Sequence, residues 1–258
     1  MKLICWNICV GMKNCYRIVH YLRQQKFDIV ALQEVMHGLE RTVYRKFKDA
    51  RNITIGLEKS LHHTAYGPLW GARKIRAYGL TVRRFGGMAQ QGNMILSRYP
   101  ILVHKNQFFL YEYQETVAAD RTNFANTDHP RAMQNVIVDI DGTRVRIINV
   151  HGMCNKDKLG SEKSLEQCKF ILREAKKTDM PTIIVGDFNL APESDGIKLI
   201  SGHYTNLCTK FGIKTTLPKG YGVIDYVFVS SHIRVNNFSV QQNKISDHFP
   251  LILDFAIC

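Results

Sequence analysis

Six short polar signatures in this 258-residue chain each follow an apolar run, and together they could carry out metal-assisted chemistry. They supply carboxylates, carboxamides and imidazoles from Asn7, Glu34, His151, Asp187, Asn189, Asp225, Asp247 and His248. If the strands share a sheet edge, these side chains converge there. Oxygen ligands with imidazoles suit Mg²⁺ or Mn²⁺ better than zinc. The pattern therefore predicts a divalent-metal site.

Hydrolysis of a phosphoester needs such a set of groups. Charge develops on the non-bridging and leaving oxygens, and a divalent cation with fixed donors stabilises that charge. Water is a poor nucleophile near neutral pH and needs a carboxylate or a metal to activate it. An Asp–His pair raises the pKa of the imidazole because the carboxylate favours its charged form. Each signature alone is a weak indication, since an Asn or Asp after a strand is usually a turn residue.

Hydrophobic spacing predicts the elements that position these groups. Short β-branched runs typical of strands occur at residues 2–8, 29–32, 80–84, 93–96, 134–140, 144–150, 182–185, 225–229 and 250–255. Helical spacing occurs at residues 15–22 and 165–172. Asn14 is the expected N-cap of the first helix, whereas the capping role of Ser161 is left open. Many strands with few helices predict packed sheets with helices outside.

The composition is that of a globular chain, and no linker or repeat divides it, so we expect one domain over residues 1–258. Hydrophobic residues make up 45% and charged residues 22%, which excludes a wholly disordered chain. No apolar run reaches the roughly 18 residues of a membrane span. The apolar stretch Leu3–Val10 is interrupted by Asn7 and lacks a cleavage pattern, so we expect no signal peptide and a cytoplasmic, intracellular location.

Cysteine usage agrees with that expectation. The chain has seven cysteines, an odd number at irregular spacings, and no C-x-x-C pair. This pattern favours free thiols in a reducing compartment over a disulfide framework, and it argues against a zinc knuckle.

Positive charge is concentrated in one quarter of the chain. The net charge is +13, and residues 41–106 hold 13 basic residues against Asp49 and Glu58. Aromatic residues interleave with these charges at Tyr44, Phe47, Tyr66, Trp70, Tyr78 and Phe85. Basic and aromatic residues together are typical of a nucleic-acid groove. The alternatives are a solvated face with rings in the core, an inositol phosphate site or an anionic membrane surface.

A compact basic group lies within this segment. Arg73, Lys74 and Arg76 fall within four residues, between the turn-like Gly67-Pro68 and Gly79. We expect a loop there that faces a polyanion beside the active site and binds substrate.

Taken in order, the signatures at residues 6–8, 32–35, 149–151, 186–189, 224–228 and 246–250 resemble the endonuclease/exonuclease/phosphatase superfamily. This is the fold of deoxyribonuclease I, AP endonucleases, sphingomyelinases and inositol-polyphosphate 5-phosphatases. The resemblance extends from Lys2 to Phe255, and residues 92–100 look like that family's G-N-x-I-L-S-R-x-P segment. It implies an α/β (α+β) four-layer sandwich, in which two packed mixed β-sheets are flanked by helices.

The resemblance also implies a role for each matched residue around the metal. Glu34 resembles the principal metal carboxylate, and Asn7 resembles the residue that supports the metal site. Asp247 would lie near the metal. Mg²⁺ is the implied cofactor, with Mn²⁺ as the other candidate.

Catalytic roles follow from the same resemblance. Asp187 resembles the residue that orients or deprotonates the attacking water, and Asn189 a donor to the phosphate or nucleophile. Asp225 resembles the carboxylate that holds His248, which would then contact the scissile phosphate. His151 resembles the second phosphate-contacting histidine, a candidate acid for the leaving oxygen. Arg131 is either a phosphate contact or a surface arginine.

Departures from the family pattern bear on the branch. AP endonucleases carry an acidic residue where this chain has Cys9, and Asn where it has His151. The histidine pair instead resembles the deoxyribonuclease-I-like, sphingomyelinase-like and phosphatase branches. Gly152 replaces the leucine that commonly follows the histidine, which suggests a specialised loop.

These observations predict an Mg²⁺-dependent phosphodiesterase, with nuclease action on DNA or RNA as the favoured function. The alternative within the class is a phosphatase or phosphodiesterase acting on a phosphoinositide or another small phosphoester. A catalytically silent nucleic-acid-binding module is the alternative of another class, and the full polar set argues against it. Protein partners are not indicated by the sequence.

Overall fold

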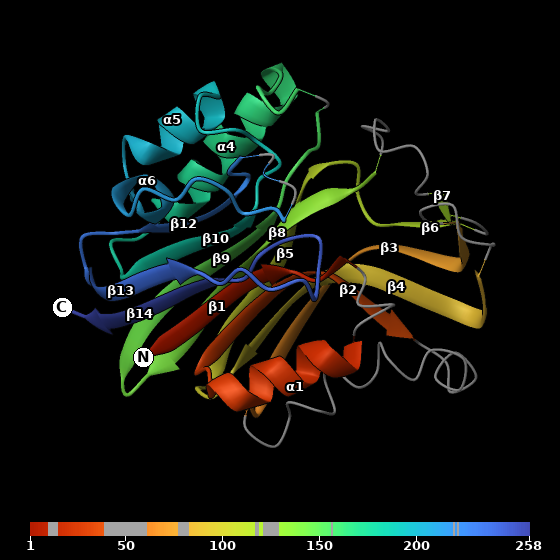
Figure 1. The fold of residues 1–258 in the computed structure, drawn as a ribbon, viewed down its shortest axis with the longest axis horizontal. Helices are drawn as coiled ribbons and strands as arrows, with labels where there is room; N and C mark the ends of the chain where they lie inside the picture. The colour runs from red at the N-terminus through yellow and green to blue at the C-terminus, as the bar shows by residue number, and fades with distance from the viewer. Residues whose placement is uncertain are drawn as a thin grey trace.

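A computed structural model of the chain describes residues 1–9, 15–38, 61–76, 83–116, 119–120, 129–155, 157–218, 220 and 222–258. Two mixed β-sheets pack face to face, and helices cover their outer faces (Figure 1). The four-layer sandwich implied by the sequence resemblance is therefore confirmed. Among the described residues, no helix is long and apolar enough to cross a membrane.

Within the described residues, the first sheet has eight strands, seven in the order β13-β14-β1-β2-β4-β3-β6 and β7 also paired to β3. Its central strands β1 and β2 are parallel, and β14 runs antiparallel to β1. The bounds are β1 (Lys2–Asn7), β2 (Ile29–Gly38), β3 (His63–Arg76), β4 (Arg83–Ser97), β6 (Gln114–Thr116), β7 (Ala119–Asp120), β13 (Ile233–Val240) and β14 (Leu251–Ile257).

In the part of the chain that the structure describes, the second sheet has six strands in the order β11-β12-β10-β9-β8-β5. Strands β9 and β10 are parallel, and β12 is antiparallel to β10. The bounds are β5 (Ile101–Leu110), β8 (Arg131–Ile140), β9 (Thr143–His151), β10 (Thr182–Asp187), β11 (Thr205–Asn206) and β12 (Asp225–Val229).

Helix α1 (Cys15–Gln25) covers the outer face of the first sheet, and α4 (Glu162–Ala175), α5 (Asp195–Ser201) and α6 (Leu207–Lys210) lie outside the second sheet (Figure 1). Ser161 caps α4: it and Ser164 form a reciprocal capping box, which answers the question left open by the sequence. The expected cap Asn14 lies outside the described residues.

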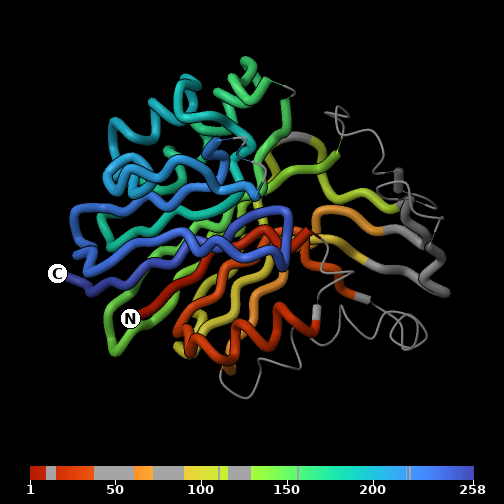
Figure 2. Tube along the Cα trace, in the orientation of Figure 1, coloured from red at the N-terminus to blue at the C-terminus, as the bar shows by residue number. Residues whose placement is uncertain are grey.

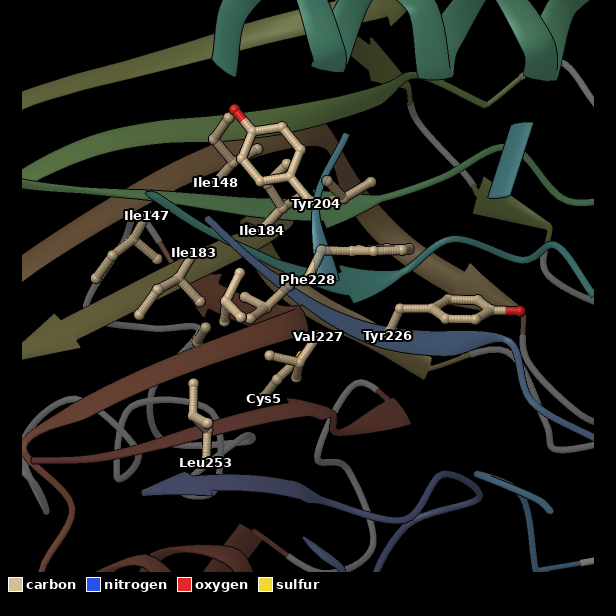
Figure 3. Close-up of a cluster of buried hydrophobic side chains, with 14 of the residues drawn as sticks. Cys5, Ile147, Ile148, Ile183, Ile184, Tyr204, Tyr226, Val227, Phe228 and Leu253 are labelled. Carbon is tan, nitrogen blue, oxygen red and sulfur yellow. The ribbon is translucent and has the colours of Figure 1, made fainter. Parts of the chain in front are cut away.

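Strand alternation divides the apolar side chains between two cores. Leu3 and Cys5 of β1 belong to the core between the sheets, whereas Ile4 and Trp6 pack with the apolar face of α1. In Figure 3, Cys5 lies beside Val227 of the second sheet.

The chain ends also lie near each other (Figure 2), and the Met1 amino group donates a hydrogen bond to the Phe255 carbonyl at 2.8 Å.

Most expected strands are confirmed, and residues 80–82 of one lie outside the described part. The expected loop carrying Arg73, Lys74 and Arg76 is wrong, because these residues belong to β3, where Lys74 pairs with Arg84. The turn signal Gly67-Pro68 lies inside the same strand, at an irregularity that shifts its register. A proline is tolerated at such a bulge, so it does not end the strand. Residues 41–60 and 77–82 of the basic segment lie outside the described residues.

The side-chain thiols that the structure describes are free, in agreement with the cysteine pattern. They belong to Cys5, Cys9, Cys154, Cys168, Cys208 and Cys258.

A buried amide cluster joins the two sheets close to the edge where the polar signatures end. Asn149 of β9 donates through Nδ2 to the Leu32 and Met94 carbonyls of the first sheet, at 3.0 and 3.3 Å. Gln33 of β2 donates to Asn149 Oδ1 at 2.6 Å, and Gln134 accepts from Asn149 Nδ2 at 3.1 Å. Buried polar groups require partners, so this cluster fixes how β9 sits on β2.

We predict that Asn149→Ala lowers the free energy of unfolding by about 2–4 kcal/mol, because two buried carbonyls and two amide side chains lose a partner. Urea unfolding measures the change. Asn237→Ala, at an exposed position on β13, is the matched control and should change stability little. Equal stabilities of the two variants would show that the cluster does not hold the sheets together.

Candidate active site

One edge of the sandwich collects the ends of strands from both sheets. Asn7 ends β1, His151 ends β9 and Asp187 ends β10. Asp225 begins β12, which runs the opposite way and so starts at the same edge. In the second sheet, Asp187 pairs in register with both His151 and Asp225. Backbone pairing alone therefore places three of the predicted catalytic residues side by side.

Asp187, Asp225 and His248 form the most compact part of the site. His248 Nδ1 lies 3.0 Å from both carboxylate oxygens of Asp225, and Nε2 lies 3.9 Å from Asp187 Oδ2. All three residues are buried, with 9% or less of each exposed. The predicted Asp225–His248 pairing is present in this geometry.

The first sheet holds His248 in place. Trp6 Nε1 donates to the His248 carbonyl at 2.9 Å, and the Ser246 hydroxyl donates to the Asn7 carbonyl at 2.8 Å. Asn7 also reaches across to the second sheet, where its Nδ2 donates to Asp187 Oδ2 at 3.0 Å. The segment before β14 is thus anchored on β1.

Glu34 enters the site through an irregularity in β2. The β2–β4 register shifts between Leu32 and Val35, and Glu34 has a φ of 59°. Left-handed backbone is uncommon for residues other than glycine, so the surrounding structure must maintain it. The result places Glu34 Oε1 3.8 Å from His151 Nε2.

His151 lies between several charged groups. Its Nε2 is 3.9 Å from Asp187 Oδ2, and the Arg131 guanidinium contacts the same nitrogen. The sequence left Arg131 as either a phosphate contact or a surface residue. The structure places it half-buried against His151, beside the proposed phosphate site.

Two glycines allow the β9 and β10 ends to approach each other. Gly186 has a φ of 142°, and a Cβ there would lie 2.0 Å from the Val150 carbonyl oxygen. A Cβ on Gly152 would lie 2.5 Å from the Phe188 carbonyl oxygen. Only glycine fits such close backbone contacts. Leucine at position 152 would collide with this turn, which gives the His-Gly departure a packing reason.

Asn189 sits on the turn after β10. Its backbone N–H donates to Asp187 Oδ1 at 2.9 Å, and its φ is 56°. Its carboxamide Nδ2 donates to the Gly152 carbonyl at 3.4 Å. Asparagine tolerates left-handed backbone better than most residues, which suits it to this position.

Burial and charge set the protonation of the central pair. Burial, followed by repulsion from Asp225, raises the pKa of Asp187 to about 6, while His248 and Lys158 act in the opposite direction. Burial lowers the pKa of His248, but Asp225 and Asp187 together outweigh it and raise that pKa to about 10. At neutral pH the site therefore contains an imidazolium beside a carboxylate that can accept a proton.

Four predicted residues lie apart from this cluster or remain without a described side chain. Asp247 is exposed, and its Oδ1 accepts a hydrogen bond from the Ser246 hydroxyl at 3.2 Å. Arg73, Lys74 and Arg76 lie on β3, and their side chains are outside the described part of the structure.

Lys158 is a site residue that the sequence analysis missed. Its Nζ donates to Asn189 Oδ1 at 2.7 Å. It comes from the loop between β9 and α4, where neither spacing nor a motif distinguishes one lysine from another. Only the folded chain brings it to the site.

The donors present fit a hard divalent cation. Glu34 and Asn7 offer carboxylate and carboxamide oxygens at the sheet edge, and both are buried. Asp187, Asp225 and His248 also have ligand atoms within 4.8 Å of one another. Because the His248 imidazole is protonated and paired with Asp225, it has no lone pair for a metal, and the oxygens of Glu34, Asn7 and Asp187 are the donors that suit Mg²⁺ or Mn²⁺.

Comparison with protein families gives a match over most of the chain. The sequence model described as "Endonuclease/Exonuclease/phosphatase family" matches residues 4–248. Comparison with curated proteins found no match.

Solved structures share the fold at low sequence identity. An endonuclease/exonuclease/phosphatase from Beutenbergia cavernae is 20% identical over the whole chain and 71% of its own length, with a TM-score of 0.74. A Bacteroides thetaiotaomicron mannosyl-6-phosphatase is 16% identical over the full length of both chains, with a TM-score of 0.67. The human Nocturnin catalytic domain is 16% identical over the whole chain and 93% of its own length, with a TM-score of 0.66.

We predict that His248 of the metal-free protein stays protonated through neutral pH and titrates near pH 10, because Asp225 and Asp187 surround it. Asp225→Asn should lower this pKa markedly, since burial then acts with less opposition. A histidine NMR titration measures both values, with Asp195→Asn, at an exposed position paired with Lys198, as the control.

The same shift has a consequence for stability. The pKa of His248 in the folded protein lies above its ordinary value of 6.5. The stabilisation that the charged imidazole contributes to the fold is therefore fully present below pH 6.5 and is lost as the pH rises through about 10. A wild-type imidazole that titrates near 6.5 would contradict the pairing.

Proposed function

Because the chain belongs to the endonuclease/exonuclease/phosphatase family, we propose that it is a divalent-metal-dependent phosphodiesterase and that its substrate is DNA or RNA. The observation that carries this proposal is the buried Asp187–Asp225–His248 cluster, which joins a proton acceptor to a paired imidazolium. The net charge of +13 supports a polyanionic substrate.

In this proposal each residue at the edge has one task. Asp187 takes a proton from the attacking water, which its pKa of about 6 allows near neutral pH. His248, oriented and kept charged by Asp225, donates a hydrogen bond to a non-bridging oxygen of the phosphate. Asn189 donates from its carboxamide to the same group.

Departure of the leaving oxygen is assigned to the other side of the site. His151 is the candidate acid for that oxygen, a role that requires Nε2 to carry a proton after the Arg131 guanidinium, which donates to this nitrogen here, has moved to the phosphate and added its positive charge there. Glu34 and Asn7 would hold Mg²⁺ or Mn²⁺. The bound cation would neutralise charge that develops on the phosphate oxygens.

Hydrolysis of a small phosphoester is the second candidate function. One structural neighbour is a mannosyl-6-phosphatase, and the catalytic groups proposed here serve a monoester as well as a diester. A panel of labelled DNA, labelled RNA and inositol phosphates with Mg²⁺ separates these substrates. A third candidate, a silent nucleic-acid-binding module, requires binding without hydrolysis of any member of the panel.

We expect Mg²⁺-dependent hydrolysis of bis-p-nitrophenyl phosphate that EDTA abolishes, and Glu34→Gln should raise the metal concentration required.

Asp187→Asn and His248→Ala should each lower kcat by at least about 10²-fold, the low end of general acid–base contributions. The two effects should be strongly non-additive, because both residues serve one transition state.

Asp179→Asn is the control for these variants, since it removes an exposed carboxylate that pairs with His232 and not with a site residue. Full activity in EDTA with no metal carried through would rule out the metal-dependent mechanism. Near-normal turnover by both site variants would rule out the residue assignments.

The basic residues of β3 provide a separate test of the nucleic-acid substrate. We predict that Arg73→Ala with Arg76→Ala weakens DNA or RNA binding across sequences and flattens the plot of log K against log[salt] by roughly one unit per lost phosphate contact on duplex DNA. Lys198→Ala with Lys210→Ala removes the same charge from exposed helical positions and is the control. An unchanged salt slope in the Arg73/Arg76 double variant would exclude β3 from the nucleic-acid-binding surface. Wild-type binding that does not depend on salt would favour the small-phosphoester function.

A further inference from the structure

Lys158 is held beside the site by its own backbone. It lies in the loop between β9 and α4, and its carbonyl accepts a hydrogen bond from the Ala191 N–H at 2.7 Å. Its φ is 60°, and its side chain is half-buried. The backbone bond ties this loop to the turn that carries Asn189, and it does not involve the lysine side chain.

The ammonium of Lys158 contacts neutral partners. Nζ donates to Asn189 Oδ1 at 2.7 Å and to Cys154 Sγ at 2.9 Å. Among the described residues, no carboxylate lies within salt-bridge distance of it. A half-buried cation gives up solvation. The Asp187 carboxylate, whose pKa Lys158 lowers, attracts it from beyond salt-bridge distance, whereas its direct hydrogen bonds go to Asn189 and Cys154.

The backbone contacts of Asn189 do not fix the orientation of its carboxamide. Its backbone is fixed on Asp187, but the amide can rotate and exchange its oxygen and nitrogen positions. Oδ1 faces Lys158 and Nδ2 donates to the Gly152 carbonyl, which leaves the second N–H of Nδ2 for a substrate oxygen. The flipped amide would bring Nδ2 against the ammonium, where two donors cannot bond to each other.

We propose that Lys158 is a positioning residue that fixes the Asn189 carboxamide with its nitrogen directed toward the phosphate. This inference rests on the proposed function, since it assigns a task to Asn189 in the same site. Without Lys158, only the 3.4 Å bond from Nδ2 to the Gly152 carbonyl would oppose the flipped amide, whose oxygen would repel a negatively charged phosphate. Lys158 prevents this by bonding to the oxygen, and it acts on the substrate through Asn189.

The first test is a double-mutant cycle on hydrolysis of bis-p-nitrophenyl phosphate. Lys158→Met keeps the length of the side chain and the backbone bond to Ala191, and it should lower kcat by about 10- to 100-fold, as expected for losing a hydrogen bond from a charged group. Lys158→Arg should restore part of the rate. In an Asn189→Ala background, Lys158→Met should add less than about 2-fold.

Lys210→Met, at an exposed position on α6, removes the same charge and is the control. An unchanged kcat in Lys158→Met, or additive effects in the double variant, would overturn the proposal while leaving the proposed function in place. An inactive wild-type protein would instead overturn the proposed function, before any Lys158 variant is compared.

The second test does not require activity. The side-chain amide resonances of Asn189, identified by their loss in Asn189→Ala, should shift in Lys158→Met and stay in place in Lys210→Met. The unfolding temperature of Lys158→Met should remain close to that of the wild type, because the loop keeps its backbone bond. Unmoved Asn189 resonances would show that the lysine does not hold the carboxamide.

Discussion

Two carboxylates buried at one sheet edge require positive charge, and His248 supplies it. Asp187 and Asp225 pair in register on neighbouring strands, so their charges cannot move apart. An imidazolium 3.0 Å from Asp225 and 3.9 Å from Asp187 attracts both and lowers their mutual repulsion. Breaking a buried charge pair by removing one partner is strongly destabilising, so the position of His248 is a condition for the stability of this edge.

That requirement links the two sheets. The carboxylates belong to the second sheet, whereas His248 precedes β14 of the first sheet and is held there through Trp6. Asn7 adds a direct bond from β1 to Asp187. The charge cluster and the packing of the sheets therefore depend on each other, and a shift of one sheet would separate the imidazolium from its carboxylates.

The buried amides around Asn149 serve the same alignment from inside the sandwich. Asn149 bonds to the carbonyl of Leu32, two residues before Glu34, and itself lies two residues before His151. This bond sets the distance between the β2 irregularity and the end of β9. The 3.8 Å separation of Glu34 and His151 is thus a consequence of core hydrogen bonding. Family membership and the solved relatives agree with this architecture.

The sequence by itself determined the family, the strands that carry the polar signatures and most of the residues that meet at the edge, because side-chain type and spacing record which strands end in polar groups. It did not indicate β3, β5 or β13. Tertiary structure alone decided the rest. Arg73 belongs to a strand because pairing with β4 overrides the Gly67-Pro68 signal. Asp247 is exposed while its neighbour His248 is buried, a difference that depends on how one turn meets β1. Lys158 reaches Asn189 across a gap of 31 residues, and a contact between two loops has no periodicity from which a sequence could predict it.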